Sequence, residues 1–321
     1  MNIVTSVQPE GQTTGNARSF AARLSEVAAE IDALLSRLLD DGPRGAPAMP
    51  PRLLEAMRYA NLGQGKRFRP FLVVETAALF GVPRENALMA GAALECVHCY
   101  SLVHDDLPAM DDDELRRGRP TVHRRFDEAT AILAGDGLLT FAFDILSRPE
   151  TSADPAVRVK LVSSLALAAG PGGMVGGQML DLAAEGRFEE GGQRLDEAQI
   201  RRLQGMKTGA LIRFAASAGA ILADIDDERS AALRRYGALI GEAFQIADDL
   251  LDIDGEAALL GKAVHKDAEA GKATLVGLLG VEAARKRLAA LTSEARTALE
   301  PFGAAATSLK EAAEFVANRR R

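Results

Sequence analysis

Apolar residues recur along most of this chain at the three- and four-residue steps of an amphipathic helix. The clearest series, Leu24, Val27, Ile31, Leu34 and Leu38, marks one face of a helix. Ala, Leu and Glu, which favour helix, are frequent in the other stretches with this pattern. These stretches are 71–80, 86–105, 126–147, 155–169, 196–223, 228–253, 281–300 and 304–319. No convincing series of alternating strand residues occurs, so the pattern predicts an all-α protein.

Segments rich in glycine and proline separate the predicted helices. They are 41–51, 81–85, 170–173 and 254–274. About ten helices with short links are typical of one large helical bundle and not of several domains. We expect residues 1–16 to be a disordered tail, which leaves residues 17–321 as a single domain.

Composition and charge exclude several classes of protein. The chain has 321 residues, 47% of them apolar, which is enough for a substantial core. Its net charge of −7 gives no general attraction to nucleic acid or to anionic lipid. No apolar run approaches the roughly 20 residues of a membrane span, and the first twenty residues contain no apolar stretch of signal-peptide length. A cytoplasmic protein without a membrane span is therefore expected.

A first acidic cluster lies in the segment HDDLPAMDDDELRRGR. Asp105 and Asp106 end an apolar helix, because Pro108 has no N–H and clashes with the carbonyl four residues before it. Asp111 lies past this turn and is free to fold back toward the first pair. Converging carboxylates repel one another unless a divalent cation intervenes, and hard oxygen ligands suit Mg²⁺. A solvated acidic loop is the alternative, and it is our interpretation of Asp112, Asp113 and Glu114.

A second acidic cluster lies in FQIADDLLD, at residues 244–252. Asp248 and Asp252 are one helical turn apart on the same face, with Asp249 beside them. The surrounding residues are apolar, and a row of carboxylates on such a helix is unfavourable unless a metal or cations compensate it. The two clusters are therefore predicted to face each other across the bundle, the alternative being two unrelated acidic turns.

Basic residues adjoin both clusters and also occur in two other segments. They are Lys66, Arg67 and Arg69 in GQGKRFRP, Arg116 and Arg117, Lys207 in KTGALIRF, and Lys262, Lys266 and Lys272. Arginine donates forked hydrogen bonds to phosphate oxygens, whereas lysine acts as a mobile point charge. The GQGKRFRP segment lacks the P-loop pattern. Any one of these cations alone is typical of a surface, but together they indicate a polyanion, most simply a diphosphate, held between Mg²⁺ and Lys/Arg.

These segments resemble motifs of the trans-prenyltransferases, the polyprenyl diphosphate synthases. DDLPAMDDDELRRGRPTVH is similar to the first aspartate-rich motif of that family, and FQIADDLLD to the second. GKRFRP, MKTGAL and GKAVHKDAEAGKATLVGLLG are similar to further family segments, in the expected order. The likeness runs from about residue 50 to the C-terminus. It implies a helical bundle around a deep central cavity, usually as a homodimer.

The resemblance also implies a role for each motif residue. Three Mg²⁺ ions would be held by Asp105, Asp106, Asp111, Asp248, Asp249 and Asp252. The allylic diphosphate would be bound with help from Arg116, Lys207 and Lys262. Isopentenyl diphosphate would be held by Lys66, Arg69, His98 and Arg117. Thr208 and Gln245 would lie near the reacting carbons, where their dipoles stabilise positive charge.

The implied reaction joins isopentenyl diphosphate to dimethylallyl diphosphate and then to geranyl diphosphate. The allylic C–O bond breaks as the leaving diphosphate is neutralised, the double bond attacks the cation, and the departing diphosphate accepts a proton. In the family, an aromatic residue five positions before the first motif, with two extra residues inside that motif, goes with a C15 product. Tyr100 and this segment have both features. On a helical wheel, however, Ser101 lies about 40° from Asp105 and Tyr100 about 140° away, so periodicity alone favours Ser101 as the cavity floor.

Three other functions compete with this interpretation. The same chemistry stopping at C20, as in geranylgeranyl diphosphate synthases, differs only in product length. A non-catalytic prenyltransferase subunit typically loses an aspartate motif, and both motifs are intact here. A terpene cyclase also ionises an allylic diphosphate with Mg²⁺, but it has no second diphosphate and would not need the cations at Lys66, Arg69 and Arg117.

Some residues invite other interpretations. Cys96 and Cys99 form a C-x-x-C pair, but no second pair or preceding strand supports zinc or redox chemistry, so we expect two core cysteines. His104 is a candidate polar partner of the aspartates. Gly176, Gly177, Gln178 and Asp181 in GGQMLD indicate close helix packing with polar groups around the site. The glycines and lysines of residues 254–274 suggest a lid over the bound diphosphate.

Overall fold

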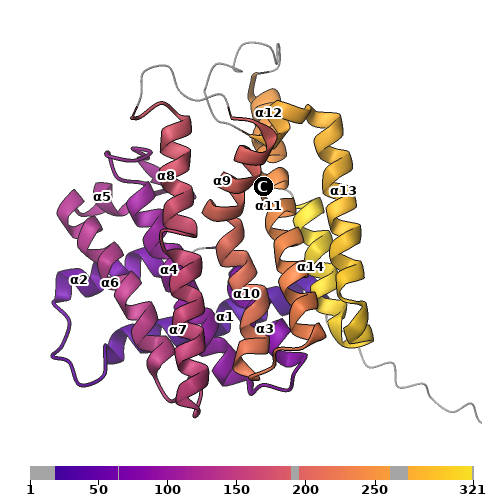
Figure 1. The fold of residues 1–321 in the computed structure, drawn as a ribbon. Coiled ribbons are helices and arrows are strands. Elements are labelled where there is room, and N and C mark those ends of the chain that lie inside the picture. The colour runs from indigo at the N-terminus through magenta and orange to yellow at the C-terminus, as the bar shows by residue number, and fades with distance from the viewer. Residues whose placement is uncertain (1–18, 64, 189–194, 261–273, 320–321) are drawn as a thin grey trace, which may run out of the picture.

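The computed structural model describes residues 19–63, 65–188, 195–260 and 274–319. The tail predicted at residues 1–16 lies outside them. Helices of the first half are α1 (Phe20–Asp41), α2 (Pro51–Asn61), α3 (Phe68–Ala78), α4 (Arg84–Asp105), α5 (Val122–Arg125), α6 (Glu128–Ser147) and α7 (Pro155–Ala169). Those of the second half are α8 (Met174–Ala184), α9 (Glu197–Lys207), α10 (Gly209–Leu222), α11 (Glu228–Leu260), α12 (Leu275–Leu279), α13 (Val281–Ala298), the 3-10 helix η1 (Glu300–Ala306) and α14 (Thr307–Asn318). Between α4 and α5, strands β1 (Leu115–Arg116) and β2 (Arg119–Pro120) form a short antiparallel hairpin. The predicted all-α bundle is confirmed (Figure 1).

Polar caps define where several helices begin. Ser19 caps α1 by accepting a hydrogen bond from the backbone N–H of Ala22 at 3.3 Å. Asp196 and Gln199 form a reciprocal capping box at the start of α9, with N···O distances of 2.8 and 2.9 Å. These caps satisfy backbone donors that have no partner within the helix. They fix the first turns of the helices locally, without help from the rest of the fold.

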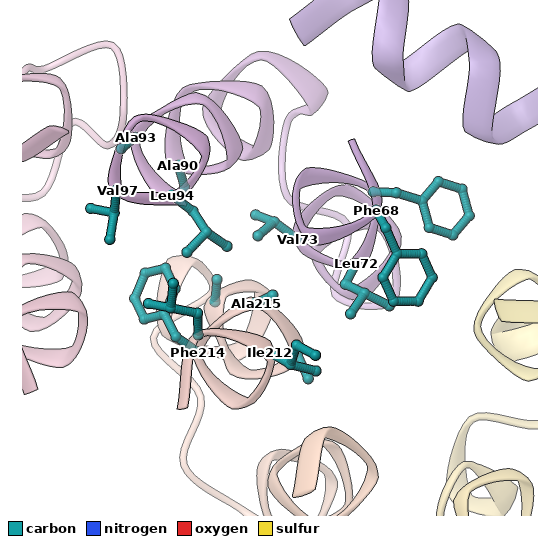
Figure 2. Packing of buried hydrophobic residues seen from close by; sticks show 14 of the residues in the cluster. Phe68, Leu72, Val73, Ala90, Ala93, Leu94, Val97, Ile212, Phe214 and Ala215 are labelled. Atoms are coloured by element: carbon teal, nitrogen blue, oxygen red, sulfur yellow. The ribbon is translucent and has the colours of Figure 1, made fainter. Parts of the chain in front are cut away.

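The core lies around α10, which packs against α3, α4, α7 and α11. Figure 2 shows Val73 of α3, Leu94 of α4 and Phe214 of α10 directed toward the space between their helices. Gly219 of α10 lets two backbones approach closely, because an added Cβ would lie 2.3 Å from the carbonyl carbon of Thr76. This dense core fixes the positions of the helix ends that carry the polar motifs.

The structure corrects the predicted helices at several points. α2 and α8 were not predicted, because their segments begin with prolines or glycines; Pro51 is at the first turn of α2, where proline is tolerated. The stretch 196–223 forms two helices that meet at Thr208, where Gly205 and Gly209 weaken the helix. α11 continues to Leu260 instead of ending at residue 253. The rest of the predicted lid, residues 261–273, lies outside the described residues.

Two stretches of the described chain are long and apolar enough to cross a membrane, namely α6 and the segment Pro155–Ala184. This contrasts with the sequence-based expectation that no segment would qualify. Core helices of soluble proteins often have the same length and composition. Half of the α6 window is buried within the protein, and Pro155–Ala184 is divided into α7 and α8 by residues 170–173. Both stretches are therefore parts of the helical bundle.

Candidate functional site

The first acidic cluster is folded as the proline predicted. α4 ends at Asp105, and the chain turns so that the backbone N–H of Asp111 donates to the carbonyl of Asp105 at 2.9 Å. Asp111 therefore returns to the end of α4. Asp106 is buried, with 4% of its side chain exposed, whereas residues 112–114 are exposed as predicted. The turn separates a pair of aspartates, Asp105 partly buried and Asp106 buried, from a solvated acidic loop.

Neighbouring polar groups hold the first cluster in place. Arg116, on the β1–β2 hairpin, donates from Nε to Asp106 Oδ1 at 2.6 Å. Gln178 of α8 donates from Nε2 to Asp105 Oδ1. Burial raises the pKa of Asp105 to about 6 and also raises the pKa of Asp106, against the opposing effect of Arg116. Both carboxylates are thus held in surroundings that disfavour their charge unless a cation is present.

The second cluster lies on α11, where Asp248 and Asp249 are adjacent and Asp252 follows one turn after Asp248. Asp249 accepts a hydrogen bond from Gln245 Nε2 at 2.9 Å and another from Gln204 Nε2 of α9 at 3.1 Å. Burial raises the pKa of Asp249 to about 6, although both amides oppose this shift. Burial likewise raises the pKa of Asp248. Asp249 is thus buried and Asp248 partly exposed, and cations compensate their charges only in part.

Helix α9 connects the two clusters. Gln204 contacts Asp249, whereas Lys207, one turn later, donates from Nζ to Asp181 Oδ2 of α8 at 2.5 Å. Burial lowers the pKa of Lys207, but the charges of Asp105 and Asp181 outweigh this effect and raise it overall. Lys207 therefore lies within electrostatic reach of the first cluster. Both acidic clusters lie beside α9, the arrangement expected if they face a common space.

The donor chemistry of these clusters fits a hard divalent cation. Within the described residues, no three His, Cys, Asp or Glu side chains converge closely enough to hold a metal ion by themselves. Mg²⁺ does not need such a cage, because it commonly keeps several waters and binds through one or two carboxylates together with substrate phosphates. Partly buried aspartates on two sides of α9 match that incomplete coordination.

A separate group of cations lies at the start of α3. Arg69 Nη1 is 3.3 Å from His98 Nε2 of α4. Burial lowers the pKa of Arg69, and burial together with Arg69 and Arg117 lowers the pKa of His98 well below its usual value. His98 is therefore neutral near pH 7. In the described part of the chain, the buried Nε of Arg69 has no hydrogen-bond partner, so this cation has a donor free for an anion.

Aromatic rings surround these cations. Lys66 Nζ is 5.3 Å from the ring centroid of Phe315, and the Arg69 guanidinium is 5.8 Å from that of Phe244. Arg319, which follows α14, stacks 3.8 Å over Phe244 and pairs with Asp248 at 2.7 Å. The cation group thus reaches from the start of α3 to the second acidic cluster.

Arg117 is positioned by a glycine. It has a left-handed backbone, with φ of 52°, and its guanidinium covers Gly65. An added Cβ at Gly65 would lie 2.2 Å from Arg117 Nη1, and φ of +95° already disfavours any other residue there. Alanine at this position would therefore displace the Arg117 guanidinium from the loop that carries Lys66.

The resemblance predicts that Arg117 holds isopentenyl diphosphate. On that prediction we expect Gly65→Ala to raise the KM for isopentenyl diphosphate by tenfold or more, because displacing Arg117 would remove a charged contact of about 1.5 kcal/mol. Steady-state kinetics measures this change. Gly63→Ala is the matched control: its φ of +71° carries the same backbone strain, but nothing lies within 4 Å of the added Cβ. An equal rise in KM for both variants would show that the strain alone, and not Arg117, is responsible.

The remaining predicted residues have mixed outcomes. Thr208 lies between α9 and α10, Gln245 contacts Asp249, and Lys262 lies outside the described residues. Tyr100 is buried with its ring edge-on to His104, and Ser101 donates to the carbonyl of His98 at 2.8 Å. The His104 ring is directed toward α6, where Nε2 is 3.0 Å from the carbonyl oxygen of Ile132 and 3.9 Å from Asp136 Oδ1.

Other predictions concern residues around the site. Cys96 and Cys99 are free and buried, so their interpretation as core cysteines is confirmed. The close packing predicted for GGQMLD is also confirmed, since an added Cβ at Gly177 would lie 2.1 Å from the backbone nitrogen of Lys207. Sequence reasoning missed Gln204 and Arg319. Gln204 had one usable signal, because it lies three residues before Lys207 on the same helical face.

Comparison with known proteins gives one consistent answer. The family model described as polyprenyl synthetase matches residues 50–307. The farnesyl diphosphate synthase of Escherichia coli K12 is 46% identical over 274 residues, 83% of this chain and 89% of that protein. The geranylgeranyl diphosphate synthase of Cyanophora paradoxa is 39% identical over 277 residues, 86% of this chain and 90% of that protein.

A solved structure has the same fold. The apo crystal structure of an FPP/GFPP synthase from Zymomonas mobilis superposes with a TM-score of 0.83 at 46% identity, covering 92% of this chain and 98% of that one. The family model matches the segment that holds both acidic clusters, α9 and the cations Lys66, Arg69 and Arg117. From the motifs, the fold and these likenesses together, the chain belongs to the polyprenyl synthetase family.

Proposed function

We propose that this chain is a farnesyl diphosphate synthase, which joins isopentenyl diphosphate to dimethylallyl diphosphate and then to geranyl diphosphate. One observation carries the proposal: two carboxylate clusters, each with one buried aspartate, lie beside α9, and a separate, partly buried cation group lies at the start of α3. Two diphosphates need two binding sites of different chemistry. The curated farnesyl diphosphate synthases that resemble this chain support the same activity.

The six motif aspartates are proposed to hold three Mg²⁺ ions with the allylic diphosphate. They are Asp105, Asp106, Asp111, Asp248, Asp249 and Asp252. Bound Mg²⁺ would neutralise the leaving diphosphate and so ease cleavage of the allylic C–O bond. The raised pKa values of Asp105 and Asp249, about 6 for each, support this role, because a divalent cation would relieve the cost of their buried charges.

The chain's own cations complete both diphosphate sites. Lys207, between Asp105 and Asp181, is placed to contact the leaving diphosphate, and Arg116 reaches it from the hairpin. Lys262 has the same proposed role. The second diphosphate is bound by Arg69, His98, Lys66 and Arg117. Two unit charges about 4 Å apart attract each other by roughly 4 kcal/mol at an effective dielectric of 20, so several such contacts provide much of the required stabilisation.

The chain orients the reacting carbons and excludes water. Gln245 and Thr208 are proposed to direct their dipoles at the positive charge that develops on the allylic carbons, although Gln245 also donates to Asp249. The bundle keeps the reacting carbons away from water. No protein base is required, because the departing diphosphate oxygen accepts the proton released from the adduct.

The decisive assay uses purified protein, Mg²⁺, isopentenyl diphosphate and each allylic primer, with products sized by chromatography. A C15 product from both dimethylallyl and geranyl diphosphate supports the proposal. A C20 product would identify a geranylgeranyl diphosphate synthase instead. Products formed from an allylic diphosphate alone would indicate a terpene cyclase. The absence of any turnover would indicate a non-catalytic subunit.

Tyr100 is proposed to set the product length by blocking the growing tail. We expect Tyr100→Ala to lengthen the product beyond C15, because it removes a buried ring five residues before Asp105. Ser101→Ala is the matched control on the alternative face of α4, and its product should stay at C15. Chromatography that shows C15 from Tyr100→Ala and a longer product from the control would transfer the role to Ser101.

The protein is also proposed to act as a cytoplasmic homodimer through α6, α7 and α8. These helices expose several large apolar side chains: Ile132, Leu133, Val159, Leu167, Val175 and Met179. Apolar surface of this kind is typical of a face that another protein covers. The α6–α8 face is the proposed dimer contact.

We expect Leu167→Glu to shift the protein from dimer to monomer, because it places a charge on a side chain that is 74% exposed on this face. Light scattering measures the mass. Leu278→Glu is the control, since Leu278 is an exposed leucine on α12. A monomeric wild type, or a dimeric Leu167→Glu variant, would contradict the α6–α8 contact.

A further inference from the structure

In the sequence, Arg67 lies between Lys66 and Arg69, which are both proposed to bind the second diphosphate. Its side chain points in a different direction from theirs. Its side chain is 1% exposed and points into the protein, whereas Lys66 is exposed and Arg69 lies against His98. Arg67 also has a left-handed backbone, with φ of 50° and ψ of 39°, immediately before the first turn of α3. A residue other than glycine in this conformation needs other contacts to hold it there.

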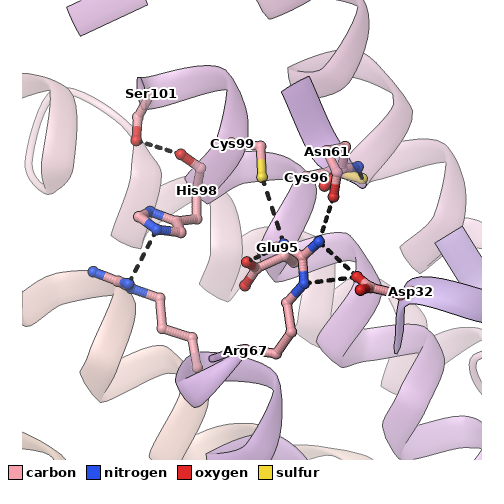
Figure 3. A network of polar contacts seen from close by, with 9 residues as sticks. Asp32, Asn61, Arg67, Glu95, Cys96, His98, Cys99 and Ser101 are labelled. Carbon is pink, nitrogen blue, oxygen red and sulfur yellow. Dashed lines mark hydrogen bonds and ion pairs between the residues drawn. The ribbon is translucent and has the colours of Figure 1, made fainter. Parts of the chain in front are cut away.

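The Arg67 guanidinium is fully occupied by protein groups, as Figure 3 shows. Nη1 donates to Glu95 Oε1 of α4 at 2.6 Å. Nε and Nη2 donate to Asp32 Oδ1 of α1 at 2.9 and 2.6 Å, and Nη2 also donates to the carbonyl of Asn61. The fifth N–H, on Nη1, is directed at Cys99 Sγ at 4.0 Å, so Arg67 has no donor to offer a substrate phosphate.

Glu95 gives this network a link to the second diphosphate site. It is a buried acid, 5% exposed, and lies three residues before His98 on α4. Among the charged groups that act on Arg69, Glu95 has the largest effect. Yet Glu95 accepts its hydrogen bond from Arg67, while Arg69 remains with His98. One buried carboxylate, on the same helix as His98, therefore attracts two arginines and is bonded to only one.

We propose that Arg67 is a positioning residue for the second diphosphate: it neutralises Glu95 and so leaves the Arg69 guanidinium available to isopentenyl diphosphate. Without the Arg67 charge, Glu95 is a buried, unpaired anion, and Arg69 is a neighbouring cation on which its charge already acts. Arg69 then turns from His98 toward Glu95 and loses its contact with the substrate. This inference rests on the proposed function.

Arg67→Gln tests the proposal through a split between the two substrates. We expect the KM for isopentenyl diphosphate to rise tenfold or more, while the KM for geranyl diphosphate stays within threefold of wild type. Calorimetric titration with isopentenyl diphosphate should show the same loss of affinity. Arg148→Gln is the matched control, because Arg148 is also buried and paired, with Asp144, away from both sites. It should leave both KM values unchanged.

A second substitution tests whether Arg67 acts by neutralising the charge of Glu95 or only by holding the structure together through its hydrogen bonds. In Arg67→Gln/Glu95→Gln the buried carboxylate is gone, so we expect the KM for isopentenyl diphosphate to return to within threefold of wild type. If Arg67 acts only through its hydrogen bonds, the KM should not recover, because the double variant has even fewer of these bonds. Arg67→Lys, which keeps the charge with fewer donors, should also stay within threefold. It remains informative if Arg67→Gln does not fold.

The outcomes separate a failure of the proposed function from a failure of the role proposed for Arg67. If the wild-type chain does not join the two substrates, the proposed function fails before the role of Arg67 is addressed. If it does so but Arg67→Gln leaves the KM for isopentenyl diphosphate unchanged, only the role of Arg67 is wrong. The same conclusion follows if the double variant binds no better than Arg67→Gln, or if Arg67→Lys loses tenfold in affinity.

Discussion

Asp105→Asn is expected to lower kcat by about a thousandfold, the size of effect seen when one preorganised electrostatic contact to the transition state is lost. The substitution keeps the shape of the side chain and removes its charge. Asp105 accepts from Gln178 and acts on Lys207, so its charge is used within the site. Steady-state kinetics measures kcat, and a thermal-shift titration with Mg²⁺ should show a smaller stabilisation than in wild type.

Asp112→Asn is the matched control for this experiment. Asp112 belongs to the same acidic segment but is exposed. Its backbone is left-handed, with φ of 54°, a conformation that asparagine tolerates. The control should therefore keep its fold and its kcat within threefold of wild type. Equal losses of kcat in both variants would mean that the acidic segment acts through its total charge and not through Asp105 as an individual ligand.

Gly177→Ala is expected to lower the free energy of unfolding by about 2 to 3 kcal/mol and kcat by about a hundredfold. The new Cβ would lie 2.1 Å from the backbone nitrogen of Lys207 and 2.5 Å from its Cα, so α8 and α9 must separate. Gln178 and Lys207 would then shift from Asp105 and Asp181, respectively. Urea denaturation and steady-state kinetics measure the two effects.

Gly172→Ala is the control for Gly177→Ala. Gly172 lies in the same glycine-rich segment, but no atom lies within 4 Å of its added Cβ. Its stability and kcat should therefore change little. A stable and fully active Gly177→Ala variant would contradict the view that contact between α8 and α9 sets the geometry around Asp105.

Local sequence determined much of the fold. The apolar face of α1 was predictable from residue spacing, and the polar residues at its start and at the start of α9 act within one turn. The break after Asp105 was predictable as well, because the steric effect of Pro108 is local. Helices whose first turns contain proline or glycine, such as α2 and α8, were missed. In both, tertiary packing outweighs weak local propensity.

The chemistry of the candidate site was also visible in the sequence, since two acidic clusters and several basic segments are short motifs. The residues that pair with these motifs in the folded protein were not visible in the sequence. Gln204 reaches Asp249 across 45 residues of chain, and Arg319 lies near Asp248 only because α14 packs on α11. The sequence alone could not show which cation faces which acid, because long-range contacts depend on how helices pack.

Arg67 shows most clearly the difference between what the sequence and what the tertiary structure determine. The sequence placed it in a basic segment with Lys66 and Arg69, and by composition all three are equivalent candidates for a phosphate. The left-handed backbone of Arg67 and its acids Asp32 and Glu95, 35 and 28 residues away, turn it into the core instead. Residue type and spacing thus determined which chemistry is present in this protein. Only the tertiary structure decided which charges are paired internally and which remain for substrate, because burial and pairing are properties of the packed helices.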